Sequence, residues 1–139
     1  MNVKSIDTIE QVRYFECDSM KVVHHLNYFV WLENARFKLV EEAKINFKEL
    51  EQLGFKFPVI EIKGKYFKSA RFGDSVLIKT ELEYPDTTKL VFRYSIYNMQ
   101  NNELLFKGFS IHVVVADDDT ILIDFDPETR EKLDSFFAV

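Results

Sequence analysis

The sequence has one cysteine among its 139 residues, four glycines, three prolines and no long hydrophobic run. A single cysteine, Cys17, excludes an internal disulfide framework. No apolar stretch approaches the roughly 20 residues that a membrane-spanning helix needs. The first ten residues, MNVKSIDTIE, lack the apolar segment of a signal peptide. We therefore expect a cytoplasmic protein without a transmembrane segment, folded as a single domain over residues 1–139.

Basic residues are not in excess either. The formal net charge is −5, which argues against nucleic-acid binding, because a nucleic-acid-binding protein normally shows a basic face. An anionic ligand would need a local basic patch, and the segment 61–71 offers Lys63, Lys65, Lys68 and Arg71. A solvated strand face that carries lysines explains the same residues equally well, so both hypotheses stay open for this segment.

The long central segment has the period of a helix. Apolar residues recur at steps of three and four residues between about Tyr28 and Gln52, which predicts one amphipathic helix. The stripe consists of Tyr28, Leu32, Ala35, Leu39, Ala43, Phe47 and Leu50. Asn27 is a suitable N-cap, and Gly54 is a suitable C-terminal stop. An unbroken helix of this length would extend on the order of 38 Å, enough to traverse a small domain.

The segments on either side of this helix have the period of strands. A strand is expected over Thr8 to Glu16 before the helix. After Pro58, alternating segments joined by short turns predict an antiparallel meander over 60–67, 75–84, 89–96 and 109–115, with a short strand at 121–123. Asp126 and Pro127 predict the start of a terminal helix to about Phe137. The expected fold is α+β, with an antiparallel sheet of about five strands wrapped around one long central helix.

The segment from Tyr14 to Arg36 combines the first strand end, an acidic turn, two adjacent histidines and the helix start. Asp18 follows Tyr14 by four residues, and His25 follows Asp18 by seven. The first N–H groups of a helix lack intrahelical partners and carry partial positive charge. Asp18, His25 and these N–H groups are expected to surround one point, where a carbonyl oxygen that becomes negative during a reaction would be stabilised.

This segment resembles the 4-hydroxybenzoyl-CoA thioesterase family, and more closely its bacterial acyl-CoA thioesterase branch, which is associated with the Tol-Pal system. The matching positions are Tyr14, Asp18, Val22, Val23, His24, His25, Tyr28, Trp31, Glu33, Ala35 and Arg36. The segment 70–74 matches a second family pattern, with Ser69 where proline is usual. Lys21 stands where the family usually has glycine, and Glu16 stands where many members have aspartate. The resemblance implies the hotdog fold.

The resemblance also implies an acyl-CoA thioesterase, which hydrolyses a thioester to a free acid and coenzyme A and needs no cofactor. Asp18 would act as the nucleophile or as a general base, and the sequence leaves both roles open. His25 would orient the thioester or protonate the departing sulfur. Tyr14 would hydrogen-bond the Asp18 carboxylate or the substrate. The expected substrate-binding residues are Tyr28, Lys65, Lys68 and Arg71.

Each of these residues also has a purely structural interpretation. Asp18 can close a turn with Ser19, and His25 can merely pack at the helix start. Tyr14 can be an ordinary strand aromatic. Further along the helix, an ion pair is the favoured interpretation of Glu33 and Arg36, which stand three residues apart.

Other classes of function fit the sequence less well. No metal site is expected, because neither His-Glu-x-x-His nor Cys-x-x-Cys spacing occurs, and a serine hydrolase is disfavoured without a Gly-x-Ser-x-Gly elbow. A non-catalytic acyl-CoA-binding or scaffold protein and an acyl-carrier-protein thioesterase are the alternatives. Since one helix leaves sheet edges that need protection, we expect a homodimer or homotetramer, and the resemblance implies an active site at the dimer interface.

Overall fold

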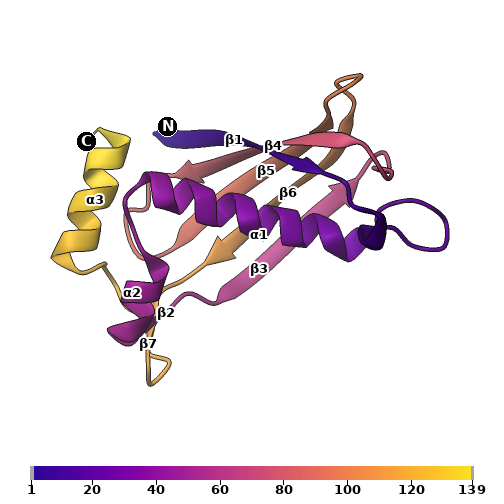
Figure 1. Ribbon diagram of the computed structural model, residues 1–139. Helices are drawn as coiled ribbons and strands as arrows, with labels where there is room; N and C mark the ends of the chain where they lie inside the picture. Colours follow the sequence, from indigo (N-terminus) through magenta and orange to yellow (C-terminus); the bar gives the residue numbers. More distant parts are fainter. Residues whose placement is uncertain (1, 139) are drawn as a thin grey trace.

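The computed structural model describes residues 2–138 as a five-stranded antiparallel sheet curved around one long helix (Figure 1). The sheet order is β1-β4-β5-β6-β3. Its strands are β1 Val3–Gln11, β3 Val59–Tyr66, β4 Ser75–Glu83, β5 Leu90–Asn98 and β6 Leu104–His112, and a separate ladder joins β2 Phe55–Lys56 to β7 Val115–Ala116. The helical elements are the 3-10 turn η1 Tyr14–Glu16, α1 His25–Glu42, α2 Phe47–Gln52 and α3 Pro127–Phe137. The predicted α+β class, the sheet of about five strands and the C-terminal helix are confirmed.

The core lies between the concave face of the sheet and the apolar stripe of α1. Trp31, Leu32 and Leu39 of α1 are almost completely buried, and the sheet contributes alternate residues because successive strand side chains point to opposite faces. These inward residues include Ile78, Phe92, Ile96 and Phe106. Within residues 2–138, no helix is both long and apolar enough to cross a membrane.

Two glycines allow the sheet to close over Phe106. Gly64 of β3 and Gly108 of β6 are paired across the two strands. A Cβ atom at Gly64 would collide with the ring of Phe106, and one at Gly108 would collide with the backbone carbonyl of Lys63. Both positions therefore require glycine for packing, and β3 can lie close against β6 beside the N-terminal half of α1.

The predicted single helix from Tyr28 to Gln52 is wrong at its start and in its middle. Helix α1 begins at His25, and His24 is its N-cap, because the His24 Nδ1 atom accepts a hydrogen bond from the N–H of Leu26 at 3.2 Å. The chain leaves α1 after Glu42 and passes through Lys44 in the left-handed region, with φ of 64°. Asn46 then caps α2 by accepting the N–H groups that follow it.

The apolar pattern of the sequence does not reveal this break between α1 and α2. Ala43, Ile45 and Leu50 remain buried, so the pattern continues across a turn in which the backbone does not. Asn27, the predicted N-cap, lies inside α1, and its side-chain amide donates to the carbonyl of Glu16 at 2.8 Å. The starts of α1 and α2 are therefore set by backbone N–H groups that donate to the side chains of His24 and Asn46, rather than by the hydrophobic period.

The first strand also ends earlier than predicted. Strand β1 runs from Val3 to Gln11 rather than from Thr8 to Glu16. The chain then turns at η1, where the N–H of Arg13 donates to the Glu16 carboxylate at 2.8 Å. This side-chain contact closes a turn that strand alternation alone does not reveal.

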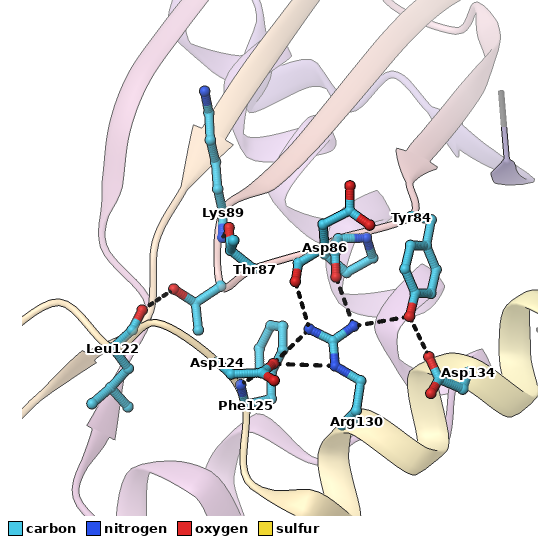
Figure 2. A network of polar contacts seen from close by, with 11 residues as sticks. Tyr84, Asp86, Thr87, Lys89, Leu122, Asp124, Phe125, Arg130 and Asp134 are labelled. Carbon is cyan, nitrogen blue, oxygen red and sulfur yellow. Dashed lines mark hydrogen bonds and ion pairs between the residues drawn. The ribbon is translucent and has the colours of Figure 1, made fainter.

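Helix α3 is fastened to the end of β4 by one guanidinium group. Figure 2 shows Arg130 between the side chain of Asp124, the hydroxyl of Tyr84 and backbone carbonyls of the following turn. Its Nη2 atom lies 2.7 Å from Asp124 Oδ1, and its Nη1 atom lies 2.6 Å from the carbonyl oxygen of Pro85. Leu133 and Phe137 of the same helix are buried. Helix α3 therefore covers the end of the core that α1 leaves open (Figure 1).

A chain of polar side chains crosses the core under the middle of α1. Arg36 donates from Nη1 to the hydroxyl of Tyr94 at 3.2 Å, and that hydroxyl is hydrogen-bonded to Ser110 Oγ. Ser110 Oγ lies 2.9 Å from His112 Nε2. The expected Glu33–Arg36 ion pair is wrong: among residues 2–138 no carboxylate lies within 4 Å of the Arg36 guanidinium.

Burial lowers the pKa of His112 from 6.5 to about 4, and the nearby positive charge of Arg36 adds to this shift. The side chain is only 7% exposed, so its protonated form would lose hydration. Below pH 6.5 the unfolded chain takes up a proton on His112 that the folded chain takes up only near pH 4. This contribution to stability is therefore complete above about pH 7 and is lost as the pH falls toward 4.

We predict that the free energy of unfolding falls by about 2 kcal/mol between pH 7 and pH 5 because of His112 alone. Urea denaturation at several pH values should show this loss in the wild type, and His112→Gln should remove it from the pH profile. His25→Gln, at an exposed position, should keep the wild-type slope. Equal slopes for the wild type and His112→Gln would contradict the prediction.

Candidate active site

The loop between β1 and α1 folds back on itself as a small hairpin. Cys17 pairs with Val23 across this hairpin, and the N–H of Asp18 donates to the carbonyl of Val22 at 2.9 Å. The N–H of Val23 donates to the carbonyl of Ala70 at 2.9 Å. The structure thus brings the two segments of the family resemblance together, with Val22 paired to Arg71, at the end of the molecule where α1 begins (Figure 1).

Glu16 fastens this hairpin to α1. Its carboxylate is buried, with the residue 5% exposed, and accepts the indole N–H of Trp31 and the backbone N–H of Arg13, both at 2.8 Å. Its backbone carbonyl accepts the N–H of His24 and the side-chain amide of Asn27, both again at 2.8 Å. Glu16 therefore accepts four hydrogen bonds. One comes from the η1 turn, one from the N-cap residue of α1 and two from side chains in the first two turns of α1.

Sequence reasoning missed this role and registered Glu16 only as a departure from the family's aspartate. A signal was present, because a buried tryptophan needs an acceptor for its N–H, and Trp31 belongs to the apolar start of the predicted helix. Glutamate is one methylene longer than aspartate. Here its two oxygens reach donors on opposite sides, the indole of Trp31 and the backbone of Arg13.

Asp18 lies in the turn of the hairpin and is partly exposed. Its Oδ1 atom accepts the N–H of Met20 at 2.8 Å, which orients the carboxylate within the turn. No hydrogen bond to Oδ2 is found within residues 2–138, so one carboxylate oxygen is available to a water molecule or a substrate. No hydrogen bond joins Asp18 to Tyr14 or to His25 in the same residues.

Lys21 holds the hairpin turn in a backbone conformation that favours glycine. Its φ angle is 64°, in the left-handed region, which costs a residue with a Cβ atom roughly 1 kcal/mol. The family usually has glycine at this position. The turn keeps the glycine-like conformation with lysine in place.

His25 is the first residue of α1 and is exposed. Its ring stacks on that of His24 with centroids 4.3 Å apart, and its carbonyl oxygen accepts the hydroxyl of Tyr66 at 2.7 Å. In the described part of the chain its backbone N–H has no hydrogen-bond partner. This N–H at the positive end of α1 is a ready donor to an oxygen that gains negative charge.

The two tyrosines of the motif lie in different surroundings. Tyr14 is 78% exposed, and its ring packs edge-on against Phe72 with centroids 5.6 Å apart. Tyr28 is buried, its hydroxyl accepts the N–H of Ala70 at 2.9 Å, and burial raises its pKa. Tyr28 therefore supports the site from within the core, and its contact with substrate stays a prediction.

The three cations predicted to bind substrate do not form one cluster. The backbone of Arg71 is paired with Val22 in the hairpin that carries Asp18. Lys68 stands three residues before Arg71 and is exposed. Lys65 is paired with Lys107 on β6 and alternates with Tyr66, whose ring packs on Phe106 in the core. Lys65 therefore lies on the outer face of the sheet, away from His25. Within residues 2–138, no group of three histidine, cysteine or acidic residues is arranged to hold a metal ion.

We predict that Glu16→Ala lowers the free energy of unfolding by about 2–4 kcal/mol, because it leaves the buried indole N–H of Trp31 without an acceptor. In a double-mutant cycle with Trp31→Phe, measured by urea denaturation, the coupling energy should be about 1–3 kcal/mol. Glu33→Gln, at an exposed position of α1, should change stability by no more than about 0.5 kcal/mol. A coupling energy near zero would exclude the Glu16–Trp31 bond as the fastening contact.

Comparison with known proteins places this geometry in a family. Residues 12–133 match the family model described as the thioesterase-like superfamily. The chain is 35% identical over 105 residues to the putative acyl-CoA thioesterase YneP of Bacillus subtilis. The aligned segment covers 76% of this chain and 75% of that protein.

Solved structures have the same fold. A DHNA-CoA thioesterase from Staphylococcus aureus superposes with a TM-score of 0.86 at 26% identity, over 96% of this chain and 91% of that one. The 4-hydroxybenzoyl-CoA thioesterase of Pseudomonas sp. strain CBS-3 superposes with a TM-score of 0.79 at 18% identity, over 92% and 98% of the two chains, which shows the fold alone. The sheet of the present chain, curved around α1, is therefore the hotdog fold, and the chain belongs to the thioesterase-like superfamily.

Proposed function

We propose that this protein is an acyl-CoA thioesterase, which hydrolyses a thioester to a free carboxylic acid and coenzyme A. The observation that carries the proposal is the pairing of two features at the start of α1. Within residues 2–138, one Asp18 carboxylate oxygen has no protein partner, and the backbone N–H of His25 is unpaired at the positive end of the helix. The 35% identity to a putative acyl-CoA thioesterase supports the same chemistry.

In the proposed reaction, the His25 N–H donates a hydrogen bond to the thioester carbonyl oxygen as that oxygen becomes negative. As a general base, Asp18 removes a proton from water while the water oxygen bonds to the acyl carbon, and the C–S bond then breaks. As a nucleophile, it would itself bond to the acyl carbon and form a mixed anhydride that water opens. In either route the coenzyme A sulfur leaves as a thiolate and takes up a proton, which the His25 ring can supply.

An apolar strip lies on edge strand β3 and on the exposed face of α1. Strand β3 is an edge strand whose Ile60, Ile62 and Tyr66 are exposed. The neighbouring face of α1 exposes Leu26, Val30 and Phe37. An edge of unpaired backbone groups beside exposed apolar side chains is a template for association. We propose a homodimer that pairs along β3, with the active site beside the interface through the Tyr66–His25 contact.

Finer features of the assignment are also proposals. They are the tetramer as a pair of such dimers, a cytoplasmic location, membership in the branch associated with the Tol-Pal system, and binding of the coenzyme A phosphates by Lys65, Lys68 and Arg71. Arg71 has the best support among these cations, because its backbone is paired with the hairpin that carries Asp18. Lys65 and Lys68 are exposed, which permits phosphate binding but does not by itself support it.

We predict that Asp18→Asn lowers kcat by about 10²–10⁴-fold, because asparagine can neither accept the proton from water nor attack the thioester at a useful rate. The asparagine oxygen can still accept the Met20 N–H, so thermal stability and substrate binding should change little. Free-thiol release from a panel of acyl-CoA thioesters measures the effect. Asp7→Asn, at an exposed position of β1, is the control and should keep wild-type turnover. An Asp18→Asn variant with near wild-type kcat would remove Asp18 from the mechanism.

We predict that Ile62→Lys converts the dimer to a monomer and lowers turnover at least tenfold, because a charge on the apolar strip opposes burial between two copies. Light scattering after size-exclusion chromatography gives the mass, and free-thiol release gives the activity. Lys63→Gln, at the neighbouring position on the outer face, should leave both unchanged. A fully active monomeric Ile62→Lys variant would show that one chain contains the complete site.

A further inference from the structure

A cavity of about 220 Å³ lies between α1, α2 and the ends of β5 and β6. Aromatic rings form much of its wall, with Phe37 and Phe47 edge-on at 5.9 Å and Phe47 and Phe57 tilted at 4.4 Å between centroids. Phe47, Phe57 and Phe92 also line a smaller, wholly apolar cavity of about 20 Å³ that reaches Leu133 of α3. The cavity wall therefore continues inward as apolar surface.

Arg36 brings a positive charge to this aromatic wall. The residue is half-buried and lines the cavity. Its guanidinium makes one side-chain hydrogen bond, from Nη1 to Tyr94, and among residues 2–138 no carboxylate lies within ion-pair distance. A guanidinium has five N–H donors in a planar fork that matches a carboxylate. Among the described residues, most of these Arg36 donors have no acceptor.

The groups around Arg36 do not neutralise it. Tyr94, Ser110 and His112 form the buried hydrogen-bonded chain behind it, and His112 is uncharged at neutral pH because its pKa is about 4. Glu33 and Glu51 also line the cavity, but both are exposed, and among residues 2–138 neither forms an ion pair with Arg36. A half-buried cation without an anionic partner is costly for a protein, and an apolar wall around it favours a ligand whose anionic group is attached to an apolar body.

We propose that this cavity binds a small carboxylate with an aromatic or short alkyl body, held by its carboxylate on Arg36 and by its body among Phe37, Phe47 and Phe57. The cavity is smaller than the 300–1,000 Å³ of drug-sized sites, which limits the ligand to about the size of benzoate or hexanoate. The site goes beyond the proposed hydrolysis, because it requires neither Asp18 nor a thioester. Two sources supply this chemistry: a free acid, such as the product of thioester hydrolysis, or a carboxylate at the far end of an acyl group.

Binding of benzoate and hexanoate to the full-length protein, followed by calorimetry and by NMR shifts, tests the proposal. Benzyl alcohol and hexanol are the uncharged probes of matched shape. The carboxylates should bind at least tenfold more tightly than the alcohols in the wild type, because only they can pair with the guanidinium fork. Equal binding of acids and alcohols would overturn the carboxylate site without any variant being needed.

Three variants locate the charge. Arg36→Met should weaken benzoate binding at least tenfold, whereas Glu33→Gln should strengthen it, because it removes a nearby negative charge without disturbing the core. Arg93→Met is the matched control, since Arg93 lies on the outer face of β5 and pairs with Glu83 at 2.9 Å; it should bind benzoate as the wild type does. Unchanged binding in a folded Arg36→Met variant, or weaker binding in Glu33→Gln, would overturn the assignment.

The Asp18→Asn variant separates this proposal from thioester hydrolysis. Benzoate binding should persist in that variant whether or not its turnover is lost, and loss of binding there would contradict an independent site. The same inactive variant distinguishes the two sources. Displacement of benzoate by glutaryl-CoA but not by butyryl-CoA assigns the site to a far-end carboxylate of the acyl group, and failure of both to displace it assigns the site to free acids.

Discussion

The buried hydrogen bond from the Trp31 indole to the Glu16 carboxylate is the contact on which the site depends. It joins the turn after β1 to the second turn of α1 at 2.8 Å, and the backbone carbonyl of the same glutamate accepts the N–H of the α1 N-cap residue. A carboxylate left without donors in this environment would be costly, so the turn and the helix must form together. The positions of Asp18 and His25 follow from this one arrangement.

The same arrangement explains why less favourable local features persist beside it. Lys21 adopts a left-handed backbone conformation that glycine would adopt without a penalty. In the described part of the chain, the N–H of His25 has no protein partner. The Lys21 conformation costs on the order of 1 kcal/mol, and both features occur within ten residues of Glu16. Such features persist where the surrounding contacts over-determine the backbone. The rigid Glu16 connection supplies those contacts, and the unpaired N–H is thereby kept available for chemistry.

The sequence is sufficient to predict the layers of this fold, because β1, β4 and β5 bury alternate residues and α1 buries every third or fourth. It is insufficient for the ends of the elements. His24 sets the start of α1 by accepting one side-chain hydrogen bond, and Asn46 sets the start of α2 by accepting two. An apolar stripe that continues through Ile45 conceals the break between the two helices. For the site, the motif predicts a centre that contains Asp18, in the hairpin turn, and His25, the first residue of α1. It does not identify Glu16, whose role depends on a tryptophan fifteen residues away, nor the chain from Arg36 to His112, which joins residues from three elements.

Phe37 connects the two regions to which we assign function. It belongs to the exposed apolar face of α1 that begins at Leu26 beside His25, and it also lines the cavity that contains Arg36. A second copy that covers the apolar strip would therefore bury Phe37 and restrict solvent access to that cavity. Excluding water would strengthen the interaction between Arg36 and a bound carboxylate. In the proposed dimer, association of the two chains would therefore control how strongly the cavity holds an anion, with no movement needed within either chain.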